Sequence, residues 1–112
     1  MRQVELDQIT DTVTTKAKEL LGDKLHSVIL YGSYARGDYN DDSDIDIMIL
    51  ADVQDKDISY FHRKMWKVTS HLSLEHDSLV SVYIKNKNFF DKWLPTLPFY
   101  KNIMKDGVRL YD

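Results

Sequence analysis

A glycine-serine turn stands shortly before two aspartates that are two positions apart. Gly32 and Ser33 follow the apolar, strand-forming run 25–31, so the turn comes directly after a predicted buried strand. Backbone amides in such a turn can face a phosphate. Asp44 and Asp46 open the next apolar run, where strand periodicity puts their side chains on one face, roughly 6–7 Å apart along the strand. A phosphate-binding turn beside a carboxylate pair that can hold a divalent cation is the chemistry of nucleotidyl transfer.

Three other known motifs partly match this segment, but the residues at their defining positions exclude them. The glycine spacing is that of a P-loop, but Asp38 and Tyr39 stand where lysine and a hydroxyl residue are required. A dinucleotide-binding fingerprint requires glycine where Tyr34 stands. An EF-hand loop requires glycine and glutamate where Ile47 and Val53 stand. The nucleotidyl-transfer interpretation is the one that survives.

The hydrophobic periodicity predicts the elements that position this segment. Apolar residues recur at helical spacing over residues 4–21 and again over 58–72, and shorter helices are expected at 89–94 and 99–105. Strands are expected at 25–31, 45–51 and 77–85, and residues 108–111 form a short extended tail. This order predicts an α/β fold with a small mixed sheet of three to five strands and helices packed mainly on one face.

Length and composition narrow the class of protein. The 112 residues, 43% of them hydrophobic, fit one domain spanning 1–112. The chain has no cysteine, no apolar stretch near the ~20 residues that span a bilayer, and a polar N-terminus, so we expect a cytoplasmic protein with no membrane association. Thiol chemistry and cysteine-rich zinc sites are excluded.

The net charge of −3 is unevenly distributed. Residues 1–57 carry 13 acids and 6 bases (net −7), whereas residues 58–112 carry 5 acids and 9 bases (net +4), which sum to −3. The acidic half contains the aspartate pair, and two ordinary solvated faces explain the asymmetry equally well. Because the lysines of the second half are spread out and form no basic stripe, we do not expect long nucleic acid as substrate, although an RNA end stays open.

The turn and the aspartate pair resemble the signature of the nucleotidyltransferase superfamily named for DNA polymerase beta. Within that superfamily the chain resembles the minimal nucleotidyltransferases that accompany HEPN-domain toxins, and the resemblance covers nearly the whole chain. Its specific part is one fifteen-residue segment in which nine positions match: Gly32, Ser33, Ala35, Arg36, Gly37, Ser43, Asp44, Ile45 and Asp46.

Each residue of the turn has an expected role. Gly32 lets the backbone approach the nucleotide's phosphates, and Ser33 adds a hydroxyl donor. Arg36 suits the triphosphate or the departing pyrophosphate, and an ion pair with nearby aspartates that holds the turn is an equal alternative. Gly37 belongs to the nucleotide-binding turn through its conformation, and Ser43 is expected to order the loop before the second strand.

The resemblance implies Mg²⁺ as the cofactor, with two ions held between the carboxylates and the triphosphate. Asp44 and Asp46 are the expected catalytic metal ligands, and family members that catalyse transfer add a third carboxylate from a later strand. Asp77, which opens the predicted third strand, is our candidate for this third catalytic ligand, and Glu75 is the alternative. A register slip of one residue would point Asp77 away, which leaves a structural role open.

Two hypotheses about function follow. In the first, the chain transfers a nucleoside monophosphate, with AMP from ATP as the expected case, to a hydroxyl group and releases pyrophosphate. The resemblance implies that the acceptor is a tyrosine of a cognate HEPN toxin and that the chain is an antitoxin. In the second, the chain is an inactive family member that neutralises a helical partner by stoichiometric binding. The sequence leaves open the preferred nucleotide, the acceptor and whether the chain forms an oligomer.

Overall fold

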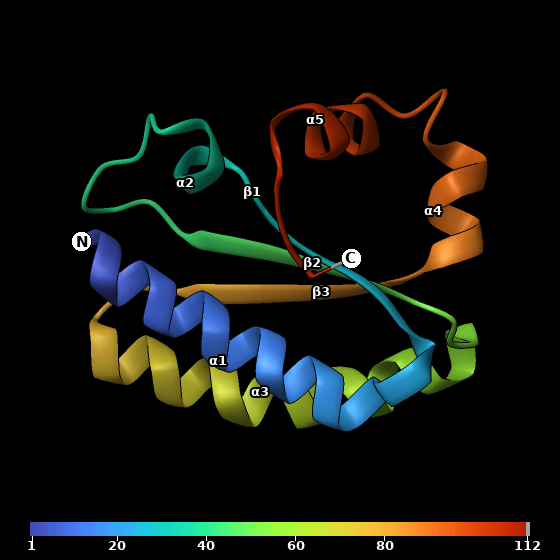
Figure 1. Cartoon of the computed structure of the whole chain (residues 1–112), viewed down its shortest axis with the longest axis horizontal. Helices are drawn as coiled ribbons and strands as arrows, with labels where there is room; N and C mark the ends of the chain where they lie inside the picture. The colour runs from blue at the N-terminus through green and yellow to red at the C-terminus, as the bar shows by residue number, and fades with distance from the viewer. Residues whose placement is uncertain (112) are drawn as a thin grey trace.

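The computed structural model describes residues 1–111. A four-stranded sheet separates two layers of helices (Figure 1). In chain order the elements are α1 (Gln3–Leu21), the 3₁₀ turn η1 (Gly22–Lys24), β1 (Leu25–Tyr31), α2 (Ser33–Arg36), β2 (Ile45–Ala51), α3 (Asp55–His76), β3 (Val80–Asn86), α4 (Lys87–Trp93), α5 (Pro98–Asp106) and β4 (Val108–Tyr111).

The sheet has the order β3-β2-β1-β4 and is mixed. β1 pairs antiparallel with β2 on one side and with β4 on the other. β2 and β3 are parallel, and α3 makes the crossover between them, as parallel strands require. The predicted small mixed sheet and α/β class are therefore confirmed.

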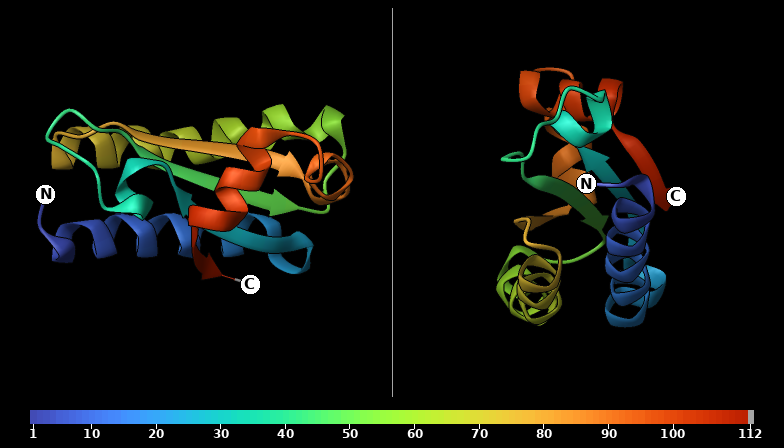
Figure 2. Two further views of the ribbon diagram at one scale, coloured as in Figure 1. Left: turned by 90° about the horizontal axis from the view of Figure 1, so that it is seen from above. Right: turned by 90° about the vertical axis from the view of Figure 1, so that its left-hand side faces the viewer.

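The two long helices lie side by side on one face of the sheet (Figure 2, right). They bury the apolar stripe of α1 and the inner residues of α3 against alternate residues of the strands, such as Val28, Ile47 and Ile84. Apolar residues recur about every 3.6 positions in the helices and at every second position in the strands. Both kinds of element therefore present apolar side chains where they pack against each other. The two long helices thus follow the prediction that helices pack mainly on one face, whereas the short helices α4 and α5 cover part of the other face.

The opposite face of the sheet carries a smaller apolar cluster under the short helices α4 and α5. Its members are Ile29, Tyr31, Met48, Leu50, Phe90, Tyr100 and Ile103. Because β1 and β2 are buried on both faces, their sequences are almost continuously apolar.

Two predicted details differ from the structure. The apolar helical pattern predicted over residues 4–21 begins with Val4, but Val4 is exposed because it lies ~200° around the helix from the buried Leu6. The third strand begins at Val80 and not at residue 77, because α3 continues to His76. The extended tail pairs with β1 as a fourth strand, β4.

Among residues 1–111, no helix is long and apolar enough to span a membrane.

Candidate functional site

The turn after β1 is held in place by one buried side chain. α2 has only four residues, and its Tyr34 is buried and stacks on Tyr39 with ring centroids 4.3 Å apart. The backbone N–H groups of Ala35 and Arg36 donate to the carbonyl oxygen of Gly32 at 3.1 Å. The turn therefore keeps one orientation relative to the sheet, as a preorganised anion site needs.

Gly32 brings the backbone of this turn against the side chain of Asp46. Its φ of 77° and ψ of −156° are accessible essentially only to glycine. A Cβ atom at this position would stand 2.7 Å from Oδ2 of Asp46. The contact arises because Tyr31, the last residue of β1, pairs with Asp46 in the antiparallel register. The predicted link between the turn and the aspartate pair is thus present in the structure.

The aspartate pair is electrostatically strained. Burial raises the pKa of Asp46, the neighbouring charge of Asp44 raises it further, and Arg36 acts in the opposite direction. Asp44 is exposed at the end of the loop, whereas Asp46 is partly buried inside the strand. Two carboxylates that repel each other beside a glycine turn are a fitting place for a divalent cation.

Two cavities meet at Asp46. One, of about 420 Å³, lies over β2 and β3 and is lined by Tyr31, Asp46, Met48, Tyr83, Lys85 and Phe99. The other, of about 250 Å³, lies between α2 and α5 and is lined by Tyr31, Gly32, Arg36, Asp46, Phe99, Asn102, Ile103 and Asp106. Tyr31, Asp46 and Phe99 belong to both cavities, which together form the candidate cleft.

The cleft has one basic side chain on each side of Asp46. Arg36 lines the cavity next to α2 and its Nε also lies 3.2 Å from Oδ2 of Asp38. Both predicted alternatives for Arg36 are therefore compatible with its position. Lys85 projects from β3 into the other cavity. Burial and then the charge of Asp46 raise the pKa of Tyr31, so this phenol remains protonated in the floor of the cleft.

Asp77 does not join the aspartate pair. It is the C-cap of α3, with a left-handed φ of 52°, and precedes β3. The parallel register instead places Ser81 beside Asp46. Within residues 1–111, no group of three or more His, Cys, Asp and Glu side chains is arranged to hold a metal ion. The expected three-carboxylate cluster with Asp77 or Glu75 is therefore not formed.

The physical reason is the length of α3. Ser73, in the last turn of this helix, accepts hydrogen bonds from two residues that follow it: its carbonyl from the N–H of Ser78 at 3.2 Å and its Oγ from the N–H of Val80 at 2.9 Å. These bonds hold residues 77–79 in a tight helix end, so strand pairing starts three residues later than predicted.

Several residues that line the cleft were not predicted from the sequence as site residues, among them Tyr83, Lys85 and Phe99. Ser81 is the residue of β3 that pairs with Asp46, and Tyr83 and Lys85 lie on the same face of β3 because alternate residues of a strand share a face. The sequence could have identified them only if this parallel register had been known. Phe99 comes from α5, and its ring meets Tyr31 edge to face at 5.8 Å. No local pattern connects Phe99 with the turn, because only the packing of α5 on β1 brings them together.

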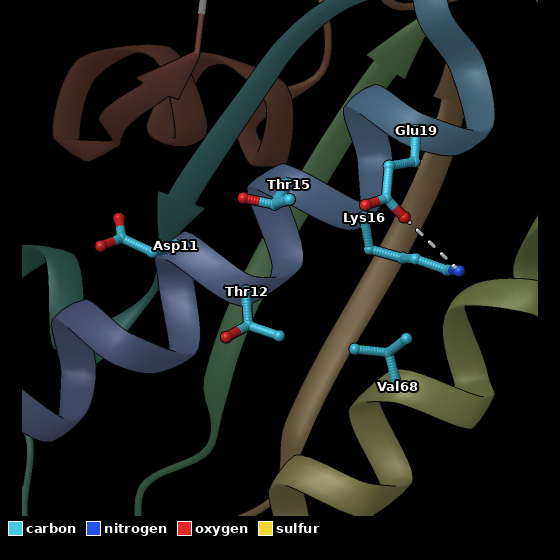
Figure 3. Close-up of a pocket in the computed structure, with 6 residues that line it drawn as sticks. All are labelled: Asp11, Thr12, Thr15, Lys16, Glu19 and Val68. Atoms are coloured by element: carbon cyan, nitrogen blue, oxygen red, sulfur yellow. Dashed lines mark ion pairs between the residues drawn. The ribbon is translucent and has the colours of Figure 1, made fainter.

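A separate hollow lies between α1 and α3 (Figure 3). It is lined by Asp11, Thr12, Thr15, Lys16, Glu19 and Val68, and Lys16 and Glu19 form an ion pair at 3.8 Å. None of the motif residues contributes to it. We therefore take the cleft at Asp46 as the candidate site.

The raised pKa of Asp46 predicts a cost in stability. The folded chain binds a proton at Asp46 more tightly than the unfolded chain does. The folded state is therefore favoured by this group at acid pH. That contribution to stability is lost as the pH rises through the pKa of Asp46 in the folded chain. Asp46→Asn should therefore melt at a higher temperature than the native chain at pH 7, by about 4 °C for each 1 kcal/mol recovered.

Calorimetry between pH 4 and pH 8 checks this expectation. The difference in melting temperature should shrink as the pH falls, because native Asp46 then becomes neutral as well. Asp41→Asn, at an exposed turn position, is the matched control and should melt with the native chain. A lower melting temperature for Asp46→Asn at pH 7 would contradict the electrostatic description of the site.

Comparison with known proteins agrees with this fold. The sequence profile of the nucleotidyltransferase domain family matches residues 11–110, and the chain belongs to this family. The chain is 35% identical over 97 residues to the Methanocaldococcus jannaschii protein named "Putative protein adenylyltransferase MJ0141", covering 87% of this chain and 96% of that protein. It is 33% identical over 88 residues to "Putative protein adenylyltransferase MJ0604" of the same organism, covering 79% and 80%.

Solved structures show the same fold. A crystal structure of a toxin-antitoxin with AMP-PNP superposes with a TM-score of 0.56 at 21% identity, covering 91% of this chain and 72% of that chain. A tri-AMPylated Shewanella oneidensis HEPN toxin in complex with an MNT antitoxin gives a TM-score of 0.51 at 18% identity, covering 94% and 71%. The predicted nucleotidyltransferase fold is thereby confirmed, and the chain is a nucleotidyltransferase by family and fold.

Proposed function

We propose that this chain transfers AMP from ATP to a hydroxyl group and releases pyrophosphate, in a reaction that depends on Mg²⁺. The observation that carries the proposal is the contact between the Gly32 turn and Asp46 at the point where two cavities meet. The names of the curated relatives support protein adenylylation in particular.

Asp44 and Asp46 would hold the Mg²⁺. They fit it because they are two carboxylates of one strand end. Burial and then the charge of Asp44 raise the pKa of Asp46, and a cation would relieve the repulsion between the two groups. Mg²⁺ in phosphoryl-transfer sites is commonly bound by one or two carboxylates together with substrate phosphates, and it supplies charge neutralisation there. A second ion would need ligands beyond this pair, such as the nucleotide itself.

The remaining residues of the cleft bind and orient the nucleotide. The turn at Gly32 and Ser33 would receive the terminal phosphates, with Gly37 shaping the turn and Arg36 placed to pair with the departing pyrophosphate. The acceptor oxygen forms a bond to the α-phosphorus while the bond to the bridging β-phosphate oxygen breaks. The proton of the acceptor hydroxyl leaves to solvent, because Ser81 and not a carboxylate stands beside Asp46 on β3.

The proposed partner is a HEPN-domain toxin, and the proposed acceptor is one of its tyrosines, which would make this chain an antitoxin. Two structures with the same fold are of toxin-antitoxin complexes, one with AMP-PNP and one with an AMPylated HEPN toxin. The second candidate function is neutralisation by binding alone. It is favoured by one observation, that Asp77 does not complete a three-carboxylate cluster.

Labelled ATP separates the two candidates. With Mg²⁺ and a purified HEPN-domain protein from the same organism, we expect label from the α-phosphate, and none from the γ-phosphate, to appear on the HEPN protein. The double variant Asp44→Ala/Asp46→Ala should transfer no label. A complex that neutralises the toxin without labelling it, and does so equally well with the double variant, would show that the chain acts by binding.

A further inference from the structure

The edge of the sheet at β3 carries an apolar groove that the proposed reaction does not use. β3 is the outer strand beside α3 (Figure 2, left), and its outer side pairs with no strand among residues 1–111. A groove of about 470 Å³ runs along this edge. Its walls include Trp66, Ser70 and Leu74 from α3, Leu79 from the link before β3, and Val82 and Tyr83 from β3.

Backbone groups of β3 face this edge. The carbonyl of Leu79 accepts from the N–H of Ile45 at 2.9 Å, so the backbone at residue 79 points toward β2. Backbone groups alternate along a strand, which directs those of Val82 and Ile84 away from β2. Val80, the first residue of the outward set, already donates its N–H to Ser73. The N–H and carbonyl groups of Val82 and Ile84 therefore face away from β2 and can pair with one further strand.

Large apolar side chains flank the same edge and are strongly exposed. Trp66 is 68% exposed, Leu74 85% and Leu79 56%. Single exposed apolar residues are ordinary, but a contiguous set along one groove is typical of an interaction site. An extended segment paired with β3 would cover the backbone groups and these side chains together, which is how strand addition combines affinity with specificity.

The groove is continuous with the candidate cleft. Tyr83, 46% exposed, lines both the groove and the cavity that contains Asp46. A strand added outside β3 would lie two strand spacings, about 9.6 Å, from β2. A tyrosine side chain on the Tyr83 face of that strand is long enough to bring its hydroxyl toward Asp46, whereas a serine side chain is too short.

The charge beside the groove indicates the charge of the bound segment. Arg63 and Lys67 share a helix face with Ser70 and Leu74, which line the groove, because successive members of this set lie three or four residues apart. From Ile58 to Leu74, α3 has no acidic residue. The next acidic residue is Glu75, which follows this stretch at the C-terminal end of the helix. The groove therefore complements an acidic segment along most of its length.

We propose that the β3 edge binds an extended, acidic segment of the protein that accepts the nucleotide, and that this segment adds a fifth strand and directs its tyrosine to Asp46. The identity of the bound protein as the acceptor depends on the proposed function. Strand addition at the β3 edge does not, so the two can fail separately.

A peptide-binding experiment on the full chain tests the proposal. The probes are fluorescein-labelled peptides of nine residues with a central tyrosine, β-branched residues and glutamates, together with counterparts in which lysine replaces glutamate. We expect the acidic peptides to bind and the basic ones to bind at least tenfold more weakly. On binding, amide hydrogen exchange should slow at Val82 and Ile84, as measured by NMR.

Substitutions in the strand and the groove provide matched controls. Val82→Pro removes an outward N–H without removing a bond to β2, and it should weaken peptide binding at least tenfold. Val82→Ala keeps the N–H and should stay within about threefold of the native chain. Leu74→Asp changes an exposed side chain and adds a repelling charge, so it should weaken binding at least tenfold while leaving AMP-PNP binding unchanged.

Each other result would overturn the proposal. The proposal fails if no acidic peptide binds, or if a peptide binds and leaves the Val82 and Ile84 amides unprotected. It also fails if the groove binds a single-stranded RNA oligomer and not the peptides, or if the chain dimerises through β3. If Val82→Pro fails to fold, the exchange measurement on the native chain decides. Peptide binding with protection but without nucleotide transfer would retain the docking site and refute the proposed function.

Discussion

Asp44→Asn and Asp46→Asn should each transfer nucleotide at least about 1,000-fold more slowly than the native chain, which corresponds to ~4 kcal/mol of lost transition-state stabilisation. Each variant leaves one carboxylate, and one carboxylate with neutral neighbours holds Mg²⁺ and the triphosphate charge poorly. The amide is close in size to the carboxylate, so the loss should come from charge and not from packing. Single-turnover transfer of the α-phosphate label at saturating Mg²⁺ is the measurement.

The neighbouring aspartates serve as controls for this prediction. Asp41 and Asp42 are exposed in the loop before β2, so their asparagine variants should stay within about twofold of the native rate. Asp77→Asn should also keep the rate, because asparagine tolerates the left-handed conformation of this helix cap. A loss at Asp77 as large as the loss at Asp46 would refute the geometry of the site and restore the three-carboxylate prediction.

Gly32→Ala should damage both stability and transfer. The backbone conformation of Gly32 costs any other residue of order 1–3 kcal/mol, which lowers the melting temperature by about 4 °C or more per kcal/mol. The added Cβ would stand 2.7 Å from Oδ2 of Asp46 and push this carboxylate from the turn. A displacement of that kind typically costs about 100-fold in rate.

Gly37→Ala is the matched control because it separates backbone strain from contact with Asp46. Gly37 also has a positive φ, of 83°, but a Cβ there would meet nothing within 4 Å. We expect Gly37→Ala to lose about 1–2 kcal/mol of stability and to transfer nucleotide within a few-fold of the native rate. Equal losses of transfer at both glycines, measured well below either melting temperature, would mean that the close approach of turn and carboxylate has no functional role.

The local part of the site could be predicted from the sequence. Strand residues 25–31 and 45–51, the intervening turn and the aspartates at its end were all located correctly, because each depends on signals within a few residues. A continuous apolar run bounded by glycines and aspartates predicts a buried strand. Two residues in one strand share a face whatever the strand pairs with. That is why Asp44, Asp46 and the Gly32 turn could be combined before the fold was known.

Tertiary structure decided which distant residues complete the cleft. The position beside Asp46 is held by Ser81 and not by Asp77, because the last turn of α3 sets where β3 begins and hence the parallel register. Lys85 and Phe99 reach the cleft only through that register and through the packing of α5. Helix ends and strand registers depend on contacts between segments far apart in the chain, which a local pattern does not encode.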